Sequence, residues 1–397
     1  MYNVNASKKT EKLKKAYVVN ADKKTEKLKK CYVVGADKKL VKLWSGFTPA
    51  FLAEVYNSLY YSEDAVNWSV KKTFTHEILG MLYGNNKYYV AARYYQYVEF
   101  YTSEDGSTWT MLSRVDNYAM EKGGFKYLNG KFFMYDNNYS SMYYSSDCIT
   151  WTAFTINDGF YNNSSYSSYT FGSVFDMEYG TVDGVTAYYV VRRVGSGNYS
   201  GCALCRYNTI DDLISGYDYE TDSSKVLLLD APSDISSFTS PKTDATLVIN
   251  NNKIYVVFNY YCTSLDRYRH RIFKYVSGSW SRVQYSNSYI VTNIWSTKDK
   301  LIYDRMYYSS GRTYVAKMAF NYSDETAPLL TVPSYPCHFD IIKYPCVGNV
   351  LVGLISASMF YSLDGGSTFT SIAISGSNTS NGIAIYGSED SGFYTER

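Results

Sequence analysis

Short runs of apolar and aromatic residues alternate with short polar stretches along most of the chain, a pattern that predicts β-strands joined by tight turns. The clearest unit places two apolar runs, residues 79–83 and 88–92, on either side of Gly84-Asn85-Asn86-Lys87. Two β-favouring runs around an Asn-rich turn predict a β-hairpin. The same hairpin pattern recurs at residues 125–135 and 247–258.

Weaker copies of this hairpin occur at residues 179–186, 295–303 and 344–353, and a seventh occurs at residues 382–394. A repeat of about 40 residues that holds two hairpins is typical of a propeller blade, which has four antiparallel strands. The sequence therefore predicts an all-β fold, a seven-bladed β-propeller. A six-bladed propeller is the alternative if one weak copy is not a blade.

The two ends of the propeller are predicted to share one blade. Six complete units span residues 75–373. The last hairpin, at 381–397, holds only the first two strands of a blade, and residues 55–73 hold only the last two. Joining these halves completes the seventh blade and removes the exposed sheet edges.

Residues 1–44 form a separate, repetitive arm ahead of the propeller domain, residues 45–397. The 15-residue unit at 4–18 repeats almost letter for letter at 19–33, and a third copy begins at Val34. Tyr-Val-Val and Leu-Val-Lys-Leu-Trp are typical of short strands, with polar turns between them, so we expect small β-hairpins. A helix is the weaker interpretation, because one leucine per repeat cannot make an apolar stripe.

The arm contains 13 lysines against two glutamates and two aspartates, so its net charge is +9 while the rest of the chain carries −7. Two-stranded hairpins bury too little surface to be stable alone. We therefore expect the arm to dock on a partner, either another copy of the chain or a larger assembly. A solvated tail is the alternative. Nucleic acid is not the expected partner, because the arm has no arginine and no base-stacking pattern.

The amino-acid composition fits a β-rich fold and bears on where the protein is made. The chain holds 46 tyrosines, and tyrosine suits a pleated surface because its ring is apolar and its tip polar. No stretch is long and apolar enough for a membrane span, and no apolar segment follows the first lysines as an export signal requires. Seven irregularly spaced cysteines do not suggest a disulfide framework, and the single Cys202-x-x-Cys205 lacks a second pair for zinc. We expect synthesis in a reducing cytoplasm, with no cofactor and no metal.

One short motif occurs four times, each time after a tyrosine-rich strand end. A serine is followed two positions later by an aspartate, and an aromatic residue closes the motif: Ser62, Asp64 and Trp68; Ser103, Asp105 and Trp109; Ser145, Asp147 and Trp151; Ser362, Asp364 and Phe369. We expect each carboxylate to accept backbone N–H bonds and fix the turn, and each ring to pack between neighbouring blades.

This motif resembles the Asp-box of sialidase-like propellers, Ser-x-Asp-x-Gly-x-Thr-Trp, although only the last copy has the full spacing. The resemblance implies a propeller with structural turns and no catalytic role for them. Sialidases also use three arginines on the substrate carboxylate, a Tyr–Glu nucleophile pair and an acid–base Asp. The Arg-Ile-Pro motif that carries the first arginine is absent here. The arm, over residues 1–44 only, resembles the Tyr-Val-Gly-rich hairpin repeats that open many bacteriophage structural proteins.

The rest of the sequence offers no catalytic motif. Its three histidines, His76, His270 and His338, are far apart, and no HExxH, GxSxG or P-loop pattern occurs. A glycosidase that needs only two carboxylates close in space stays open. We predict a binding or display protein rather than an enzyme.

The predicted binding surface is the face built by the loops between second and third strands and by the connections between blades. These segments are rich in Tyr, Asn and Arg, which suit sugars and protein epitopes alike. The candidate residues are Arg93, Tyr94, Tyr95, Tyr97, Asn137, Asn138, Tyr139, Tyr260, Tyr261, Arg267, Arg269 and Tyr307. Ordinary exposed tyrosines in a Tyr-rich protein are the alternative interpretation.

Together these features predict a bacteriophage virion protein of the fibre, tail or head-attached kind, made in the host cytoplasm. The arm would dock on other virion proteins, and the chain would act as a homo-oligomer or an assembly subunit. The propeller would be displayed for binding host surface glycan. One alternative is a cellular carbohydrate-binding or sialidase-like glycosidase propeller, and a second is a purely structural decoration or scaffold subunit.

Overall fold

In the computed structural model the chain divides into two compact units, residues 1–49 and 50–397, which are described separately. In the first unit the structure describes only the strands. In the second unit the structure describes residues 50–116, 120, 124–135, 141–156, 160–163, 166–196, 199–215, 226–228, 244–262, 267–276, 279–286, 289–297, 299–309, 312–327, 329–330, 342–355, 358–373, 384–387 and 394–395.

The arm consists of three antiparallel hairpins, one for each copy of its repeat. Their strands are β1 (Tyr2–Val4) with β2 (Thr10–Lys12), β3 (Tyr17–Val19) with β4 (Thr25–Lys27), and β5 (Cys31–Val34) with β6 (Leu40–Trp44). The first two copies share one register, since Val4 pairs with Thr10 and Val19 with Thr25. The hairpin interpretation of the arm is confirmed, and the helical one is wrong.

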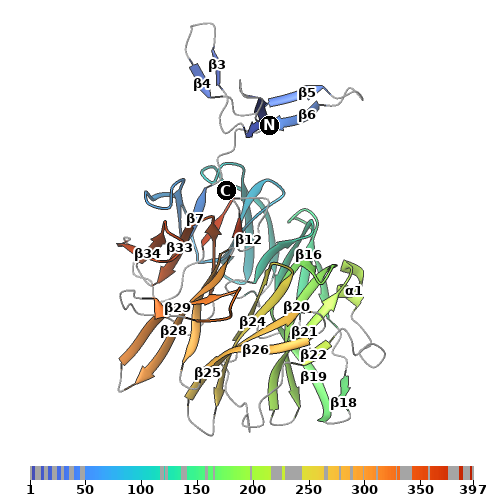
Figure 1. The fold of residues 1–397 in the computed structure, drawn as a ribbon. Helices are drawn as coiled ribbons and strands as arrows, with labels where there is room; N and C mark the ends of the chain where they lie inside the picture. The colour runs from blue at the N-terminus through green and yellow to red at the C-terminus, as the bar shows by residue number, and fades with distance from the viewer. Residues whose placement is uncertain are drawn as a thin grey trace. The chain divides into compact units, whose positions relative to one another are not determined.

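The second unit is a seven-bladed β-propeller, in which each blade is a small, mainly antiparallel sheet (Figure 1). The predicted fold class is confirmed, and the six-bladed alternative is wrong. Three blades have four strands in simple sequence order. Blade 2 holds β10 (Ile78–Gly84), β11 (Lys87–Tyr94), β12 (Tyr97–Ser103) and β13 (Thr110–Asp116); blade 3 holds β14 (Phe125–Leu128), β15 (Lys131–Tyr135), β16 (Ser141–Ser145) and β17 (Thr152–Thr155); blade 5 holds β23 (Asp244–Asn250), β24 (Lys253–Cys262), β25 (Arg267–Val276) and β26 (Ser279–Ser286).

Three further blades carry additional elements. Blade 4 holds β18 (Phe160–Asn163), the long β19 (Tyr166–Val182), β20 (Val185–Ser196), β21 (Tyr199–Tyr207), the helix α1 (Ile210–Ser215) and β22 (Val226–Leu228). Blade 6 holds β27 (Ile290–Ser296), β28 (Lys300–Ser309), β29 (Arg312–Asn321), β30 (Leu329–Leu330) and β31 (Ile342–Tyr344), and blade 7 holds β32 (Cys346–Val347), β33 (Val350–Ile355), β34 (Ser358–Ser362), β35 (Thr370–Ala373) and β37 (Tyr394–Thr395). Two of these strands, β31 and β37, are parallel to the first strand of their blade.

Blade 1 closes the ring with strands from both ends of the propeller. Its order is β36 (Ala384–Tyr386), β7 (Phe51–Val55), β8 (Ser58–Ser62) and β9 (Ser69–Thr73). The shared blade is therefore confirmed, but its predicted composition is wrong. The N-terminal side supplies three strands, because Phe51–Val55 is a buried strand that pairs on both edges. The C-terminal side supplies only β36, and β37 joins blade 7 instead.

Five apolar clusters among the described residues hold neighbouring blades together. Each cluster combines side chains from two or three successive blades, as between blades 4 and 5, where Phe175 and Leu204 meet Leu247 and Phe258. Many of the described tyrosines lie in the core rather than on the surface. Tyr88 is fully buried, and its hydroxyl lies 3.0 Å from both the nitrogen and the carbonyl oxygen of Ala50. That side chain therefore ties blade 2 to the start of blade 1.

The four Ser-x-Asp turns connect β8 with β9, β12 with β13, β16 with β17 and β34 with β35, and in each the serine hydroxyl donates to the aspartate. In blade 2, Ser103 Oγ donates to Asp105 Oδ1 at 3.0 Å, and the same oxygen accepts N–H bonds from Ser107 and Thr108 at 2.9 Å each. In blade 1, the backbone N–H of Asn67 is the main contact that lowers the pKa of Asp64, to about 2. The closing rings pack between blades: Trp151 stacks on Phe100 at 4.7 Å. The sequence predicts these contacts correctly.

Candidate functional site

The predicted binding residues lie at strand ends more than in loops. Arg93 and Tyr94 end β11, Tyr97 begins β12, and Tyr95 lies in the two-residue turn between them. Tyr260 and Tyr261 end β24, Arg267 and Arg269 begin β25, and Tyr307 lies on β28, so the loops are shorter than predicted. The side chains of these last five lie outside the described residues. Asn137, Asn138 and Tyr139 lie outside them entirely.

Where the predicted surface is described, its side chains form a compact group, which we call the blade 1–2 patch: His76, Tyr94, Tyr95, Tyr97 and Arg114. His76 comes from the connection between blades 1 and 2, and its ring lies 5.1 Å from that of Tyr94 and 5.2 Å from that of Tyr95. The two tyrosine rings lie 5.0 Å apart, edge to face. Tyr95 is 76% exposed, whereas His76, Tyr94 and Tyr97 are half-buried, so the patch presents chiefly the Tyr95 ring to solvent.

Backbone hydrogen bonds hold the connection that carries His76. Ile78 N donates to Tyr56 O at 3.0 Å, and Arg93 N donates to Glu77 O at 2.8 Å. Because these bonds join the turn of blade 1 to β11 of blade 2, the two blades position the patch together. Tyr95 has a φ of 54°, a left-handed conformation that places this bulky residue at the tip of the turn.

Arg114 is the polar centre of the patch. On β13 it pairs directly with Glu99 on β12, and its guanidinium binds the Glu99 carboxylate through both Nε, at 3.1 Å, and Nη2. Glu99 is 7% exposed and also accepts a hydrogen bond of 2.7 Å from the Tyr101 hydroxyl. The Arg114 guanidinium carbon lies 4.6 Å from the centre of the Tyr94 ring and 5.4 Å from that of Tyr97. A buried carboxylate thus fixes an exposed guanidinium against two aromatic rings.

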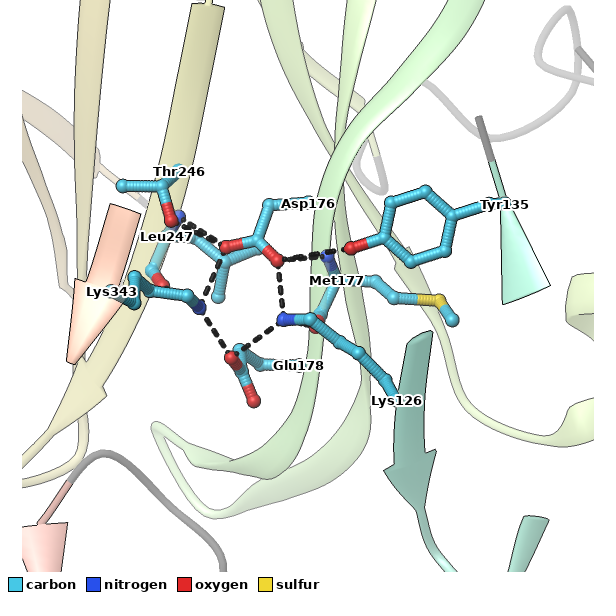
Figure 2. Close-up of polar contacts among 8 residues, drawn as sticks. All are labelled: Lys126, Tyr135, Asp176, Met177, Glu178, Thr246, Leu247 and Lys343. Carbon is cyan, nitrogen blue, oxygen red and sulfur yellow. Dashed lines mark hydrogen bonds and ion pairs between the residues drawn. The ribbon is translucent and has the colours of Figure 1, made fainter. Parts of the chain in front are cut away.

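A second concentration of charge lies among strands of blades 3, 4 and 6 (Figure 2). Lys126 comes from β14, Asp176 and Glu178 from β19, and Lys343 from β31. Lys343 Nζ lies 2.7 Å from Asp176 Oδ2, and Lys126 Nζ lies 2.9 Å from Glu178 Oε1. Lys126 also forms an ion pair with Asp176, and Lys343 also forms one with Glu178. We call these four residues the central charge cluster.

Blade 5 completes the shell of this cluster. The hydroxyl of Thr246 donates to Asp176 Oδ2 at 2.6 Å, and the backbone N–H of Leu247 donates to the same oxygen at 3.0 Å. The carbonyl of Leu247 accepts a bond from Lys343 Nζ at 3.0 Å. Every charged group therefore has partners, which is what burial of charge requires.

The electrostatics of the central charge cluster suit structure rather than acid–base chemistry. Burial alone would raise the pKa of Asp176, but the ammonium groups of Lys126 and Lys343 outweigh burial and hold that pKa well below its usual range. A general acid needs a raised pKa. Asp176 is therefore unsuited to protonate the leaving group of a glycoside.

Other candidate chemistry is limited in the described part of the chain. No group of three His, Cys, Asp or Glu side chains gathers there to hold a metal ion. Cys202 and Cys205, both buried on β21, pack into different apolar clusters and form no disulfide, so the two thiols do not converge. None of the described helices is long and apolar enough to cross a membrane.

Sequence reasoning misses His76, Glu99 and Arg114 in the patch and all four residues of the central charge cluster. A usable signal exists for some of them. Asp176 and Glu178 stand two apart in a strand with no other charged residue, so they share one side of it. For Glu99 and Arg114 the signal is opposite charge on the two strands that flank a Ser-x-Asp turn.

Comparisons with known proteins identify no family for this chain. No protein-family model and no curated protein matches the chain. Among solved structures, apo AztD from Citrobacter koseri is 12% identical, with 86% of this chain and 98% of that chain covered and a TM-score of 0.47. An α-L-arabinofuranosidase, Arb93A from Fusarium graminearum, is 12% identical, with 67% and 85% covered and a TM-score of 0.39.

Oligopeptidase B from Trypanosoma brucei is 9% identical over 83% of this chain, with a TM-score of 0.42, and this chain spans 49% of its length. A glycosidase and a peptidase thus occur among the structural neighbours. At these identities they carry no information on the activity or ligand of this chain. The resemblance of its turns to the Asp-box and of its arm to bacteriophage repeats stays a prediction.

Proposed function

We propose that this chain is a bacteriophage virion protein whose arm attaches it to the particle and whose propeller binds glycan on the host surface without cleaving it. The observation that carries the binding role is the blade 1–2 patch. It combines one exposed aromatic ring, that of Tyr95, which can stack on the apolar face of a sugar, with a fixed guanidinium that can donate to hydroxyl groups.

The arm supports the attachment role. Its three hairpins have two strands each, and such hairpins gain stability by pairing or packing with something larger. Its net charge of +9 also separates it chemically from the propeller, which carries −7. An arm of this kind fits a docking segment, and its repeats resemble those of bacteriophage structural proteins.

Two buried carboxylates support the part of the proposal that the propeller does not hydrolyse its glycan. Asp176 is held ionised by two lysines, and Glu99 is engaged by Arg114 and Tyr101. Neither is placed as a free general acid. Release of sugar from a bound glycan would overturn this part of the proposal.

The test compares the full chain with a variant that lacks residues 1–44. This deletion leaves Ala50 and its bonds to Tyr88 in place. We expect the shortened chain to melt cooperatively, to bind host cells, and to be absent from purified particles or oligomers. Retained protein and released sugar are measured on the same cells. Unchanged assembly after deletion would refute the attachment role, and loss of folding would show that the arm belongs to the propeller.

A further inference from the structure

We infer that the glycan bound at the blade 1–2 patch is neutral, and that acidic sugars are disfavoured there. This inference rests on the proposed glycan-binding role and specifies its ligand class. It departs from the expectation raised by the sialidase resemblance, in which arginines would select a sugar carboxylate.

The argument begins with the charge of Arg114. Its Nε and Nη2 both donate to Glu99, so a buried carboxylate already neutralises the guanidinium. A ligand carboxylate that approached Arg114 would also approach Glu99, which is 7% exposed and weakly screened by water. A neutral hydroxyl pair avoids this repulsion and can still accept from the part of the guanidinium that faces solvent, since the Arg114 side chain is 42% exposed.

The second arginine at the patch is compensated in the same way. Arg93 Nη1 lies 4.0 Å from Glu77 Oε2, and Arg93 Nη2 donates to the carbonyl of Met120 at 3.4 Å. Asp116, which pairs with Tyr97 across the strands, adds one negative charge. Arg93 and Arg114 with Glu77, Glu99 and Asp116 therefore give the described charged groups named at the patch a net charge of −1.

The remaining recognition surface is aromatic. His76, Tyr94 and Tyr95 lie edge to face with one another, and the exposed Tyr95 ring with its hydroxyl is open to a ligand whose own surface alternates CH groups with hydroxyls. Hexoses and N-acetylhexosamines have such a surface. Phosphate-bearing or carboxylate-bearing polymers gain nothing from it beyond what the compensated arginines provide.

The test uses the full chain and pairs of oligosaccharides that differ only in a terminal carboxylated sugar. We expect the neutral member of each pair to bind at least tenfold more tightly, with affinity that changes less than twofold between low and high salt. Tyr95→Ala should weaken neutral binding about tenfold, because stacking on the exposed ring is lost. Leu363→Ala, at an exposed apolar residue on a Ser-x-Asp turn of blade 7, is the matched control and should bind as the parent does.

A charge variant makes the inference specific. Glu77→Gln removes one compensating carboxylate from a partly exposed position, so it should fold normally and raise affinity for the acidic member about threefold to tenfold. Glu99→Gln should do the same more strongly, provided that its melting temperature matches the parent. Tighter binding of acidic members by the parent chain would overturn the inference and leave glycan binding intact. Failure to bind either member would overturn the proposed glycan-binding role itself.

Discussion

Lys343 and Asp176 join two blades that are not neighbours in the ring. Lys343 Nζ, on β31 of blade 6, lies 2.7 Å from Asp176 Oδ2 on β19 of blade 4, and blade 5 lies between them in the order of the ring. The same ammonium also binds Glu178 and the carbonyl of Leu247 in blade 5. Since the two side chains are 13% and 5% exposed, water competes little for either charge.

The first prediction is that Lys343→Met destabilises the propeller by about 3–5 kcal/mol, the typical cost of removing one partner from a buried ion pair. The variant leaves two buried carboxylates facing Lys126 alone. Urea denaturation would measure the change in unfolding free energy. Lys87→Met is the control, because its pair with Glu104 spans 3.7 Å between side chains that are 39% and 59% exposed, and should cost less than about 1 kcal/mol. Equal costs for the two variants would contradict the assignment.

The second prediction concerns acid. His270 is 2% exposed, and burial, followed by the nearby charge of Arg305, lowers its pKa to about 4, although its contact with the Tyr289 carbonyl at 3.0 Å opposes the shift. The unfolded chain takes up this proton near pH 6.5 and the folded one only near pH 4. Stability from neutral His270 is therefore complete above pH 6.5 and is lost as the pH falls towards 4, by about 3 kcal/mol in all.

Comparison of His270→Gln with the parent isolates this effect from other titrating groups. Glutamine keeps an N–H donor and does not titrate. Between pH 7 and pH 4.5, the unfolding free energy should fall by about 2–3 kcal/mol less in the variant than in the parent. A profile that is the same for the variant and the parent would show that His270 does not couple to folding.

The sequence predicts local features of this fold well because their signals are local. Asn85 and Asn86 both have positive φ, as do Asn129 and Gly130, which is the backbone that Asn- and Gly-rich hairpin turns require. The short helix α1 is missed although a signal exists: Thr209 Oγ1 accepts the Asp212 N–H at 3.1 Å, and Asp212 Oδ2 accepts the Thr209 N–H at 3.0 Å. A Thr-x-x-Asp capping box of this kind is readable in a sequence.

The long-range side-chain contacts are not predictable from this single sequence. Lys126, Asp176 and Lys343 lie on blades 3, 4 and 6, and no pattern near any of them in the sequence indicates its partner. The blade 1–2 patch is partly predictable from the sequence. Tyr94 and Tyr95 can be selected from composition and turn position, but Arg114 is added by the cross-strand register of β12 and β13. That register follows from a bulge between Phe100 and Tyr101, which has no clear signature in the sequence.

The third prediction concerns the Ser-x-Asp turns. Asp105→Ala removes the acceptor of the Ser107 and Thr108 N–H groups and the partner of Ser103, and should cost roughly 1–3 kcal/mol. Asp105→Asn keeps one acceptor oxygen and should cost less. Glu104→Ala, at the exposed neighbour, is the control. Thermal unfolding reports the difference, and glycan binding should be the same for all variants that remain folded. A loss of binding in folded Asp105→Ala would assign this turn to the ligand site.

The fourth prediction tests ring closure at blade 1. Strand β36 pairs with β7, Ala384 opposite Ala53, and Gly387 N donates to Ala50 O at 3.0 Å. A chain that ends at residue 383 loses this strand and exposes the edge of β7, so we expect a much lower melting temperature and aggregation. A chain that ends at residue 387 loses only the two residues of β37 among the described strands, and should stay monodisperse. Gly387→Ala probes the same contact in the full chain, because an added Cβ would lie 2.2 Å from the Tyr88 hydroxyl that binds Ala50. If the chain ending at 383 melts with the full-length chain, the propeller is closed by blade-to-blade packing rather than by β36.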